Sequence, residues 1–537
     1  MKHFILLLSL FLCIASVTPV HSATWNVNNL ADFQTRLTQA QNNGQNDTIN
    51  VAAGVYNVAT TLTYVPTEAN TLTIQGTSAV STVLDGGNSV HIMSVNTGAG
   101  GSGADITIRG LTFRNGTNGA GDGGGLDAEG EGAIITVENC IFSNNTASGT
   151  GGAVRMNPRE NGTVYFENNT VGGNNSAGGS GGSVYVNTAD NGTLYIRNNS
   201  ITGTNTSGGA GGALYANTAG GGTSVISGNT ISGNNTGTRG GGIFANTASN
   251  STLTISNNTV SGTNTASSID GGGIYGNTSS SSTLTFSGNS IFGTNTAASI
   301  GGGVRLNGGS GTTITVVNNT ISGTNSAPED GGGLFVNAPS DGFLYLVNNT
   351  VTGNNATNDG GGVYISSSGT SNIYNNIIRD NTAGADGDDL YIDTSGVNSV
   401  NLFNNILGPN SDFVTASSED FFVTDTTNYS QGSNSTDNPL LGPLQDNGGP
   451  TFTRALPSNS PAIDAGDNAI IATLGLTGDQ RGYPRITDST VDIGAYEFGF
   501  GSALSVPAMT GWGMSMAVFL AGIIAVCYMR RQKRAAR

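Results

Sequence analysis

The stretch Gly271–Ile300 reads GGGIYGNTSSSSTLTFSGNSIFGTNTAASI and is one copy of a repeat that fills the middle of the chain. It opens with a run of glycines, and such runs return about every 30 residues, a period typical of stacked repeat proteins. Because each copy packs mainly on its neighbours, the period predicts an elongated solenoid. The runs are Gly151–Gly152, Gly181–Gly182, Gly211–Gly212, Gly240–Gly242, Gly271–Gly273, Gly301–Gly303, Gly331–Gly333 and Gly360–Gly362.

Each copy contains three short strand candidates separated by polar turns, which in the quoted copy are Gly273–Gly276, Thr283–Phe286 and Ser290–Phe292. Nothing in the copy has helical periodicity. Pairing of each strand with its equivalent in the next copy predicts an all-β, right-handed parallel β-helix with three strands per turn, similar to pectate-lyase-like solenoids. The interior columns are expected to be Leu194, Leu253, Leu284, Ile314 and Leu344, and Ile201, Ile231, Val260, Ile291, Ile321 and Val351.

Asparagine recurs at three positions in each copy, and this too has a structural explanation. Asn tolerates left-handed turn geometry and can hydrogen-bond backbone groups. Stacked about 4.8 Å apart in successive turns, Asn side chains can also bond one another in ladders. One column runs from Asn139 and Asn169 to Asn349, a second from Asn157 and Asn187 to Asn337, and a third from Asn145 and Asn175 to Asn355.

The composition restricts the possible partners of the chain. The 537 residues include 84 Gly, the formal net charge is −17, and the only lysines are Lys2 and Lys533. An acidic central region argues against nucleic acid and anionic membrane surfaces as partners, and is compatible with an extracellular protein or with cation binding. His91 is the only histidine between the two end segments, so catalytic triads are not expected. Cys140 is the only central cysteine, which leaves no intrachain disulfide framework.

The N-terminal region divides into two parts before the regular copies begin. Residues 1–22 have a basic residue, a short apolar run and small residues before Ala23, the pattern of a secretory signal peptide. Residues 23–116 are expected to form a cap and irregular turns, with a short helix at Ala31–Gln41 over the first turn. Residues 117–410 form the regular copies of the repeat.

The C-terminal end carries a second targeting pattern. After a linker, 499–505, the apolar run Met514–Met529 is followed by a basic cluster, which predicts a transmembrane helix with a cytoplasmic tail. The preceding residues, with Pro507, Trp512 and Gly513 matching and Val506 departing conservatively, resemble the IPTL-CTERM sorting signal of Gram-negative bacteria. The resemblance implies that residues 506–537 are processed by an exosortase-type membrane protease.

The end of the ectodomain, 411–498, is expected to hold terminal turns and a different kind of module. Its motifs are Asp446–Thr451, Ser460–Gly466, Asp479–Gly482 and Asp492–Glu497. They resemble the choice-of-anchor Q domain of bacterial surface proteins, which implies surface display without a defined activity. On physical grounds we expect this module to close the open end of the solenoid, where unpaired strands invite aggregation.

An aromatic stripe is the first candidate site. Two positions before the second Asn column, aromatic residues recur, with arginine at two positions, and we expect these side chains to face solvent. With interspersed arginines they could form a platform for sugar rings, or they could simply stabilise an exposed sheet by cross-strand stacking, at about 0.2–1 kcal/mol per pair. The stripe consists of Arg155, Tyr185, Tyr215, Phe244, Tyr275, Arg305, Phe335 and Tyr364.

An acidic stripe is the second candidate site. Asp330, Asp359 and Asp389 follow the repeat spacing, so they are expected to stack in adjacent turns beside the aromatic stripe. Close carboxylates shift one another's pKa, as in glycosidase pairs, which makes these three the candidate catalytic residues. Alternatively Asp386, Asp388 and Asp389 could bind Ca²⁺, the one cofactor that the sequence suggests, or the acids could be solvated turn residues.

These patterns predict an exported protein of a Gram-negative bacterium, first tethered to the inner membrane and then displayed on the cell surface or released. Its partners would be the export machinery, the sorting protease and an extracellular polysaccharide. We expect a structural, adhesive or glycan-binding element rather than an enzyme. The alternative is a polysaccharide lyase or glycoside hydrolase that uses outer-face carboxylates, since a fold hosts many functions.

Overall fold

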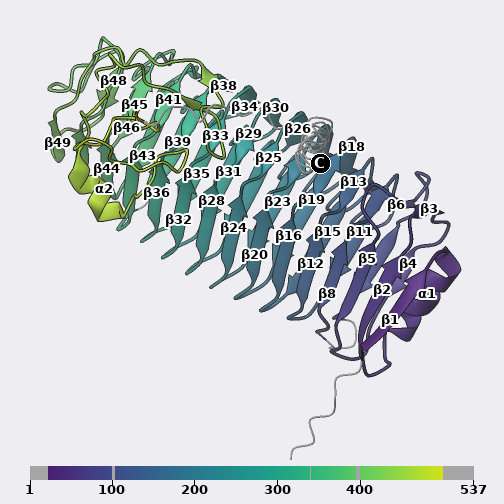
Figure 1. The fold of residues 1–537 in the computed structure, drawn as a ribbon. Coiled ribbons are helices and arrows are strands. Elements are labelled where there is room, and N and C mark those ends of the chain that lie inside the picture. The colour runs from purple at the N-terminus through teal and green to yellow at the C-terminus, as the bar shows by residue number, and fades with distance from the viewer. Residues whose placement is uncertain (1–21, 99–102, 339, 395–398, 500–537) are drawn as a thin grey trace, which may run out of the picture.

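The computed structural model, which describes residues 22–98, 103–338, 340–394 and 399–499, is a parallel β-solenoid (Figure 1). Four long parallel sheets, here called A to D, run along its axis, with 15, 13, 12 and 9 strands in sheets A, C, B and D. Sheet A runs from β1 (Ser22–Val27) to β49 (Tyr429–Gly432) and sheet C from β4 (Leu62–Tyr64) to β48 (Phe421–Val423). Sheet B runs from β3 (Gly54–Asn57) to β45 (Ile377–Arg379) and sheet D from β10 (Thr117–Asn118) to β42 (Asn355–Ala356).

The quoted copy supplies one strand to each sheet, so a turn has four strands instead of the predicted three. They are β31 (Ile274–Thr278) in sheet C, β32 (Thr283–Ser287) in sheet A, β33 (Ser290–Ile291) in sheet B and β34 (Thr294–Thr296) in sheet D. The fourth strand has no apolar side chain from which it could be predicted, because its inward residue is Asn295, which is fully buried.

The two predicted apolar columns are confirmed as core. Leu284 and Ile291 are fully buried, as are their equivalents in neighbouring turns, and all belong to one continuous hydrophobic cluster that runs along the solenoid. Aromatic side chains join the core in the N-terminal turns, where the rings of Phe113 and Phe142 stack with centroids 5.1 Å apart. The alternation of inward and outward residues in each short strand therefore places its polar side chains outside.

The first Asn column forms a buried ladder beside this core. The Asn258 Oδ1 atom accepts hydrogen bonds from the backbone and side-chain amides of Asn229, at 3.0 Å each, and its Nδ2 atom donates to Ile226 O and Asn289 Oδ1. The same pattern continues from turn to turn through Asn405. The first member is not Asn139, as predicted, because Cys140 occupies the inward position there and donates its amide to Asn169.

The predicted N-terminal helix is confirmed as α1 (Leu30–Gln39), which lies at the N-terminal end of the solenoid (Figure 1). Asn29 caps it, since its side chain accepts a hydrogen bond from the Asp32 amide at 2.9 Å. Phe33 and Leu37 are fully buried and join the main core. The helix therefore covers apolar side chains of the first turns.

Residues 438–499 do not close the end of the solenoid, so that prediction is wrong. With β50 (Leu444–Gln445), β51 (Thr453–Arg454) and α2 (Asn468–Leu474), they fold back along the side of the C-terminal turns (Figure 1). Thr451 bonds Gly288 O, and Asn348 bonds Asp492 O, across more than 140 residues of sequence. Turn residues of sheets A and B supply the partners, and the segment therefore covers a side instead of an end.

The predicted sorting motif and membrane helix, 506–537, lie outside the described residues, as does the signal peptide up to residue 21. Within the four described ranges, no helix is long and apolar enough to cross a membrane.

Candidate binding face on sheet C

The predicted aromatic stripe forms a continuous stack on the outer face of sheet C. The rings of Tyr185 and Tyr215 lie 4.7 Å apart with planes 2° from parallel, and Phe244 and Tyr275 continue the stack at 5.1 and 5.2 Å. Arg305 takes the place of the next ring. Beyond Arg305 the stack resumes and includes two residues that were not predicted, in the order Phe335, Tyr364, Tyr391 and Phe422.

The rings are less exposed than predicted. Phe244, Tyr275 and Phe335 are only 7–8% exposed, because each ring face is covered by the ring or guanidinium of the adjacent turn. Burial, followed by the neighbouring Tyr185, raises the pKa of Tyr215 to about 12, so its hydroxyl stays protonated. A sugar cannot stack on these ring faces, and what the column offers to solvent is ring edges and tyrosine hydroxyls.

The glycine runs lie beside this column, and its close packing explains why they consist of glycine. Gly271 has a φ of +67°, and a Cβ atom there would lie 2.9 Å from the Tyr275 Cβ atom. The first residue of the run must therefore be glycine, because a side chain there would collide with the aromatic column.

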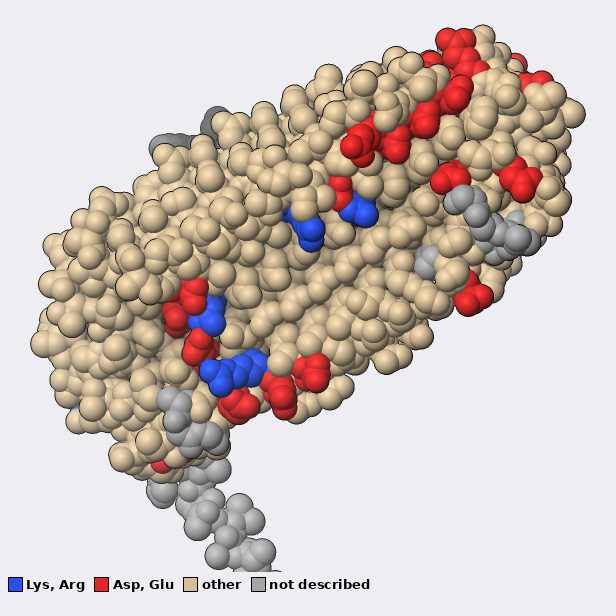
Figure 2. Space-filling view, turned by 180° about the vertical axis from the view of Figure 1, so that it is seen from behind, with Lys and Arg blue, Asp and Glu red and all other residues tan. Residues whose placement is uncertain are grey.

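The second Asn column lines the other side of the stack as an outer ladder. Asn217 donates to Asn187 at 2.7 Å, Asn246 to Asn217 at 2.6 Å and Asn277 to Asn246 at 2.5 Å. These amides are partly buried, and the ladder continues through Asn337. Figure 2 shows that this side of the molecule is hollowed along its length, with a few basic side chains in the hollow and acidic ones along its border.

Arg155, at the N-terminal end of the stripe, is neutralised. Its guanidinium forms ion pairs with Asp122, Asp127 and Glu129. Burial raises the pKa of Asp127 to about 6, although the positive charge of Arg155 opposes that rise. This position is therefore an internal ion-pair network, and it offers no free positive charge to a ligand.

Two of the three predicted catalytic acids stack, and the third does not. The turn before each glycine run is held by backbone bonds from Gly301 to Asp330 O, from Gly331 to Asp359 O and from Gly360 to Asp386 O. The residues that directly precede the glycine runs form a column beside sheet C, here called the rim. Its acidic part consists of Asp330, Asp359 and Asp386. Burial, followed by the charges of Asp359 and other acids, raises the pKa of Asp330.

Asp389 lies inside the solenoid, so its predicted place in the outer stripe is wrong. It is 1% exposed, and its Oδ1 atom accepts hydrogen bonds from the backbone and side-chain amides of Asn381, as an Asn does elsewhere in the third Asn column. Its Oδ2 atom has no hydrogen-bond partner among the described residues and lies beside Gly408, as does the Asp420 carboxylate. Burial and the Asp420 charge raise the pKa of Asp389 to about 8.

The Ca²⁺ candidates do not converge. Asp386 belongs to the rim, Asp388 accepts a hydrogen bond from the Ala383 amide, and Asp389 is interior. In the part of the chain that the structure describes, no group of three or more His, Cys, Asp or Glu side chains is arranged to hold a metal ion.

We expect Asp389→Asn to stabilise the protein at alkaline pH and to flatten the pH dependence of its stability. The folded pKa of about 8 exceeds the unfolded value of about 4, so stability is highest in acid and falls as the pH rises through 8. An Asn amide would keep the bonds to Asn381 and could donate to Asp420, a gain of about 1–3 kcal/mol at pH 8. Urea unfolding at pH 5 and pH 8 measures the change, and an unchanged slope between these pH values would contradict the assigned burial.

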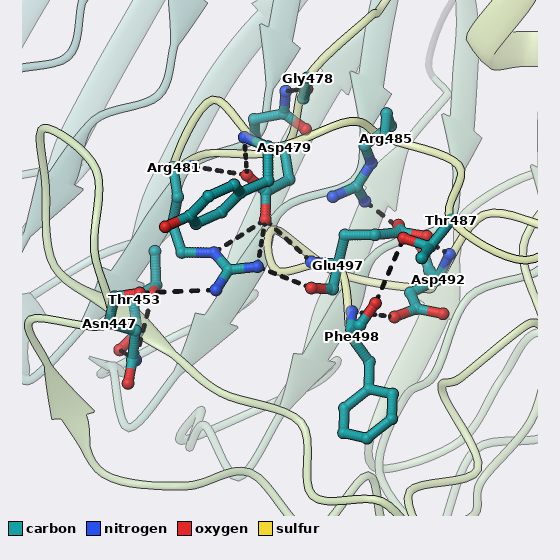
Figure 3. Close-up of polar contacts among 12 residues, drawn as sticks. Asn447, Thr453, Gly478, Asp479, Arg481, Arg485, Thr487, Asp492, Glu497 and Phe498 are labelled. Atoms are coloured by element: carbon teal, nitrogen blue, oxygen red, sulfur yellow. Dashed lines mark hydrogen bonds and ion pairs between the residues drawn. The ribbon is translucent and has the colours of Figure 1, made fainter. Parts of the chain in front are cut away.

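A second cluster of charged residues lies inside the C-terminal segment (Figure 3). Asp479 accepts bonds from Arg481 Nε at 2.9 Å and from the Glu497 amide at 3.1 Å, and Arg481 stacks on the Tyr496 ring at 3.6 Å. Arg485 and Asp492 are equally buried, and burial raises the pKa of Glu497 to about 8. The charged residues of the motifs at Asp479–Gly482 and Asp492–Glu497 therefore meet, together with Arg485, in one buried network.

No protein-family model, curated protein or solved structure matches this chain. Any assignment of function therefore depends on the chemistry of its own surfaces. The buried network of Figure 3 is closed to solvent, with Asp479, Arg481 and Glu497 at most 5% exposed, so it fastens the segment and offers no site to a ligand. Among the described residues, the outer face of sheet C carries a partly accessible row of polar groups, the Asn ladder, over many successive turns.

Proposed function

We propose that this chain is an exported surface protein that binds an extended polysaccharide along the outer face of sheet C. Export, sorting through the C-terminal tag and membership of the choice-of-anchor Q proteins are parts of this proposal, supported by the sequence motifs at 1–22, 438–498 and 506–537. We also infer that the solenoid is right-handed and pectate-lyase-like, since parallel crossovers have that hand in about 98% of cases.

The observation that carries the proposal is the arrangement of polar groups along this face. Tyrosine hydroxyls emerge from a rigid stack, and the outer Asn ladder runs parallel to them two residues further along each strand. The Asn amides repeat with the turn spacing of about 4.8 Å, and the hydroxyls of Tyr185, Tyr215 and Tyr275 recur beside them, so similar polar groups return along a line. A long, hydroxyl-rich chain such as a polysaccharide can match such a row, whereas a compact ligand would use little of it.

Binding would then depend on ring hydroxyls and edges rather than on sugars stacked on ring faces. This distinguishes the proposal from the platform suggested by the sequence. It also explains why Phe244 and Phe335 are tolerated in the column, since they preserve the stack while contributing only an edge.

The variant Tyr185→Phe/Tyr215→Phe tests this proposal, because it removes two hydroxyls and keeps the stack. Each lost hydrogen bond is worth about 0.5–1.5 kcal/mol, so we expect a combined loss of affinity of about tenfold for the best ligand of a polysaccharide panel. Tyr165→Phe/Tyr195→Phe, a stacked pair at 5.1 Å on sheet A, is the matched control and should bind normally. Equal binding by both variants would rule out this face as the binding site.

A further inference from the structure

We propose that Arg239 and Arg305 form a site for an anionic group, a carboxylate or a sulfate, carried by the bound polysaccharide. The inference rests on the proposed function and adds a specific position and charge to it. Most of the binding face is uncharged or acidic, so a positive site at its middle would select among polysaccharides.

Arg305 is held rigidly within the aromatic stack. Its guanidinium lies 5.1 Å from the Tyr275 ring centroid and 5.8 Å from that of Phe335, and it forms an ion pair with Asp270, which is 2% exposed. Its buried Nε atom has no hydrogen-bond partner among the described residues. A stacked guanidinium keeps its plane and its donors in fixed positions, which suits recognition of an anionic group with two neighbouring oxygens.

Arg239 supplies a second positive charge at the edge of the same face, one turn before Asp270, the acid that pairs with Arg305. The Gly211 amide bonds Arg239 O, which places Arg239 in the rim column immediately before the glycine run and one turn before Asp270. Its side chain is exposed and has no hydrogen bond or ion pair within the described ranges. Burial raises the pKa of Tyr275 and lowers that of Arg305, and the Arg239 charge lowers both.

The charge balance at this point is positive. Asp270 pairs with Arg305 and leaves Arg239 without an ion pair among the described residues, and Tyr275, in the turn between them, carries a further hydroxyl donor. Figure 2 shows basic side chains gathered in the middle of the hollowed face, well separated from the N-terminal group of mixed charge. Arginine forms strong, often bidentate hydrogen bonds to the oxygens of anionic groups such as carboxylates.

The direction of the bound chain follows from the rim. Before Arg239 the rim residues are Ser180 and Ala210, which carry no charge, whereas beyond Arg305 they are Asp330, Asp359 and Asp386. An anionic chain would be repelled by the acidic part. With its charge at Arg239 and Arg305, the polysaccharide therefore extends toward Tyr215 and Tyr185.

The test compares three labelled oligosaccharides of equal length with the purified protein: polygalacturonate, sulfated dextran and neutral dextran. We expect at least one anionic probe to bind more tightly than the neutral one, and Arg239→Ser to weaken that binding about tenfold. Ser occupies the same rim position at Ser180, so this variant should fold. Arg239→Lys, which retains the charge, should lose less, and Arg197→Ser on sheet A is the control with equal loss of charge.

Each outcome decides a different question. Preference for polygalacturonate alone assigns the site to carboxylates, preference for sulfated dextran alone assigns it to sulfates, and both support a general oxyanion site. Equal binding of neutral and anionic probes, or equal weakening by Arg239→Ser and Arg197→Ser, would overturn the anion site while the proposed function stands. If none of the three probes binds, the anion site is overturned, and a failure of the wider polysaccharide panel would reject the proposed function as well.

Discussion

Replacing Arg481 with Met is expected to release residues 438–499 from the side of the solenoid while the solenoid itself stays folded. The Arg481 guanidinium pairs with the Asp479 carboxylate at 2.8 Å, donates to Glu497 O at 2.6 Å and lies on the Tyr496 ring. Asp479 and Arg481 are both 5% exposed, so methionine would leave a buried carboxylate without its cation. Removing one partner of such a pair costs about 3–5 kcal/mol.

Hydrogen exchange is the appropriate measurement, because the effect is local and a single unfolding midpoint would hide it. Amides of residues 462–497 should lose protection, while those of β31 and its neighbours should not. Arg454→Met is the control, since Arg454 is only partly buried and bonds Gly442 O and the Thr352 hydroxyl, for an expected cost of about 1 kcal/mol. The double variant Asp479→Asn/Arg481→Met should cost less than Arg481→Met alone, and additive costs would show that the pair is not coupled.

The repeat period predicted the solenoid because its signal is carried by apolar residues that must face inward. Leu284 stands between Thr283 and Thr285, and both Leu284 and Ile291 are fully buried; burial of such apolar side chains is the main term that favours folding. The strand of sheet D could not be predicted from hydropathy. Its inward residue, Asn295, is polar and is stabilised by hydrogen bonds along a ladder instead of by burial of apolar surface. Hydropathy reports only the first of these effects.

Two errors of position at the candidate site have one cause, which is a single short turn. Asn349 and Asn376 occupy successive positions of the buried ladder only 27 residues apart, whereas earlier members are separated by 29 to 31. Counting forward by 30 therefore reached Asp389 instead of Asp386 and passed over Tyr391, which follows Tyr364 by one turn. The backbone hydrogen bonds identify the correct partner where spacing alone does not.

The position of the C-terminal segment could not be predicted from the repeat. Gln480 donates to Asn289 O, and Thr320 donates to the Gln480 side chain, across 191 and 160 residues. The sequence singled out the motif at Asp479–Gly482, and the structure shows that its buried side chains attach the segment to the solenoid. No local pattern specifies which turn of a regular solenoid such a segment will contact.

Removal of one Asn from the buried ladder should have a large effect for a different reason. We expect Asn258→Ala to destabilise the solenoid by about 2–5 kcal/mol, because each buried polar group left without a partner costs about 1–3 kcal/mol. The substitution would strand the Asn229 amide and the Ile226 carbonyl, and all of these groups lie in the dry interior. Since each turn supports the next, the loss should spread to the adjacent turns rather than remain at one position.

The outer ladder provides the matched control. Asn246→Ala removes a side chain of the same type from a parallel row of similar geometry, but Asn246 is only partly buried and water can replace its bonds to Asn217 and Asn277. Its expected cost is below about 1 kcal/mol, within the usual range for accessible hydrogen bonds. Urea unfolding followed by circular dichroism compares the two variants, and hydrogen exchange at Asn229 and Asn289 tests the spread. Equal costs for both variants would mean that ladder geometry, and not exclusion of water, determines the stability of these turns.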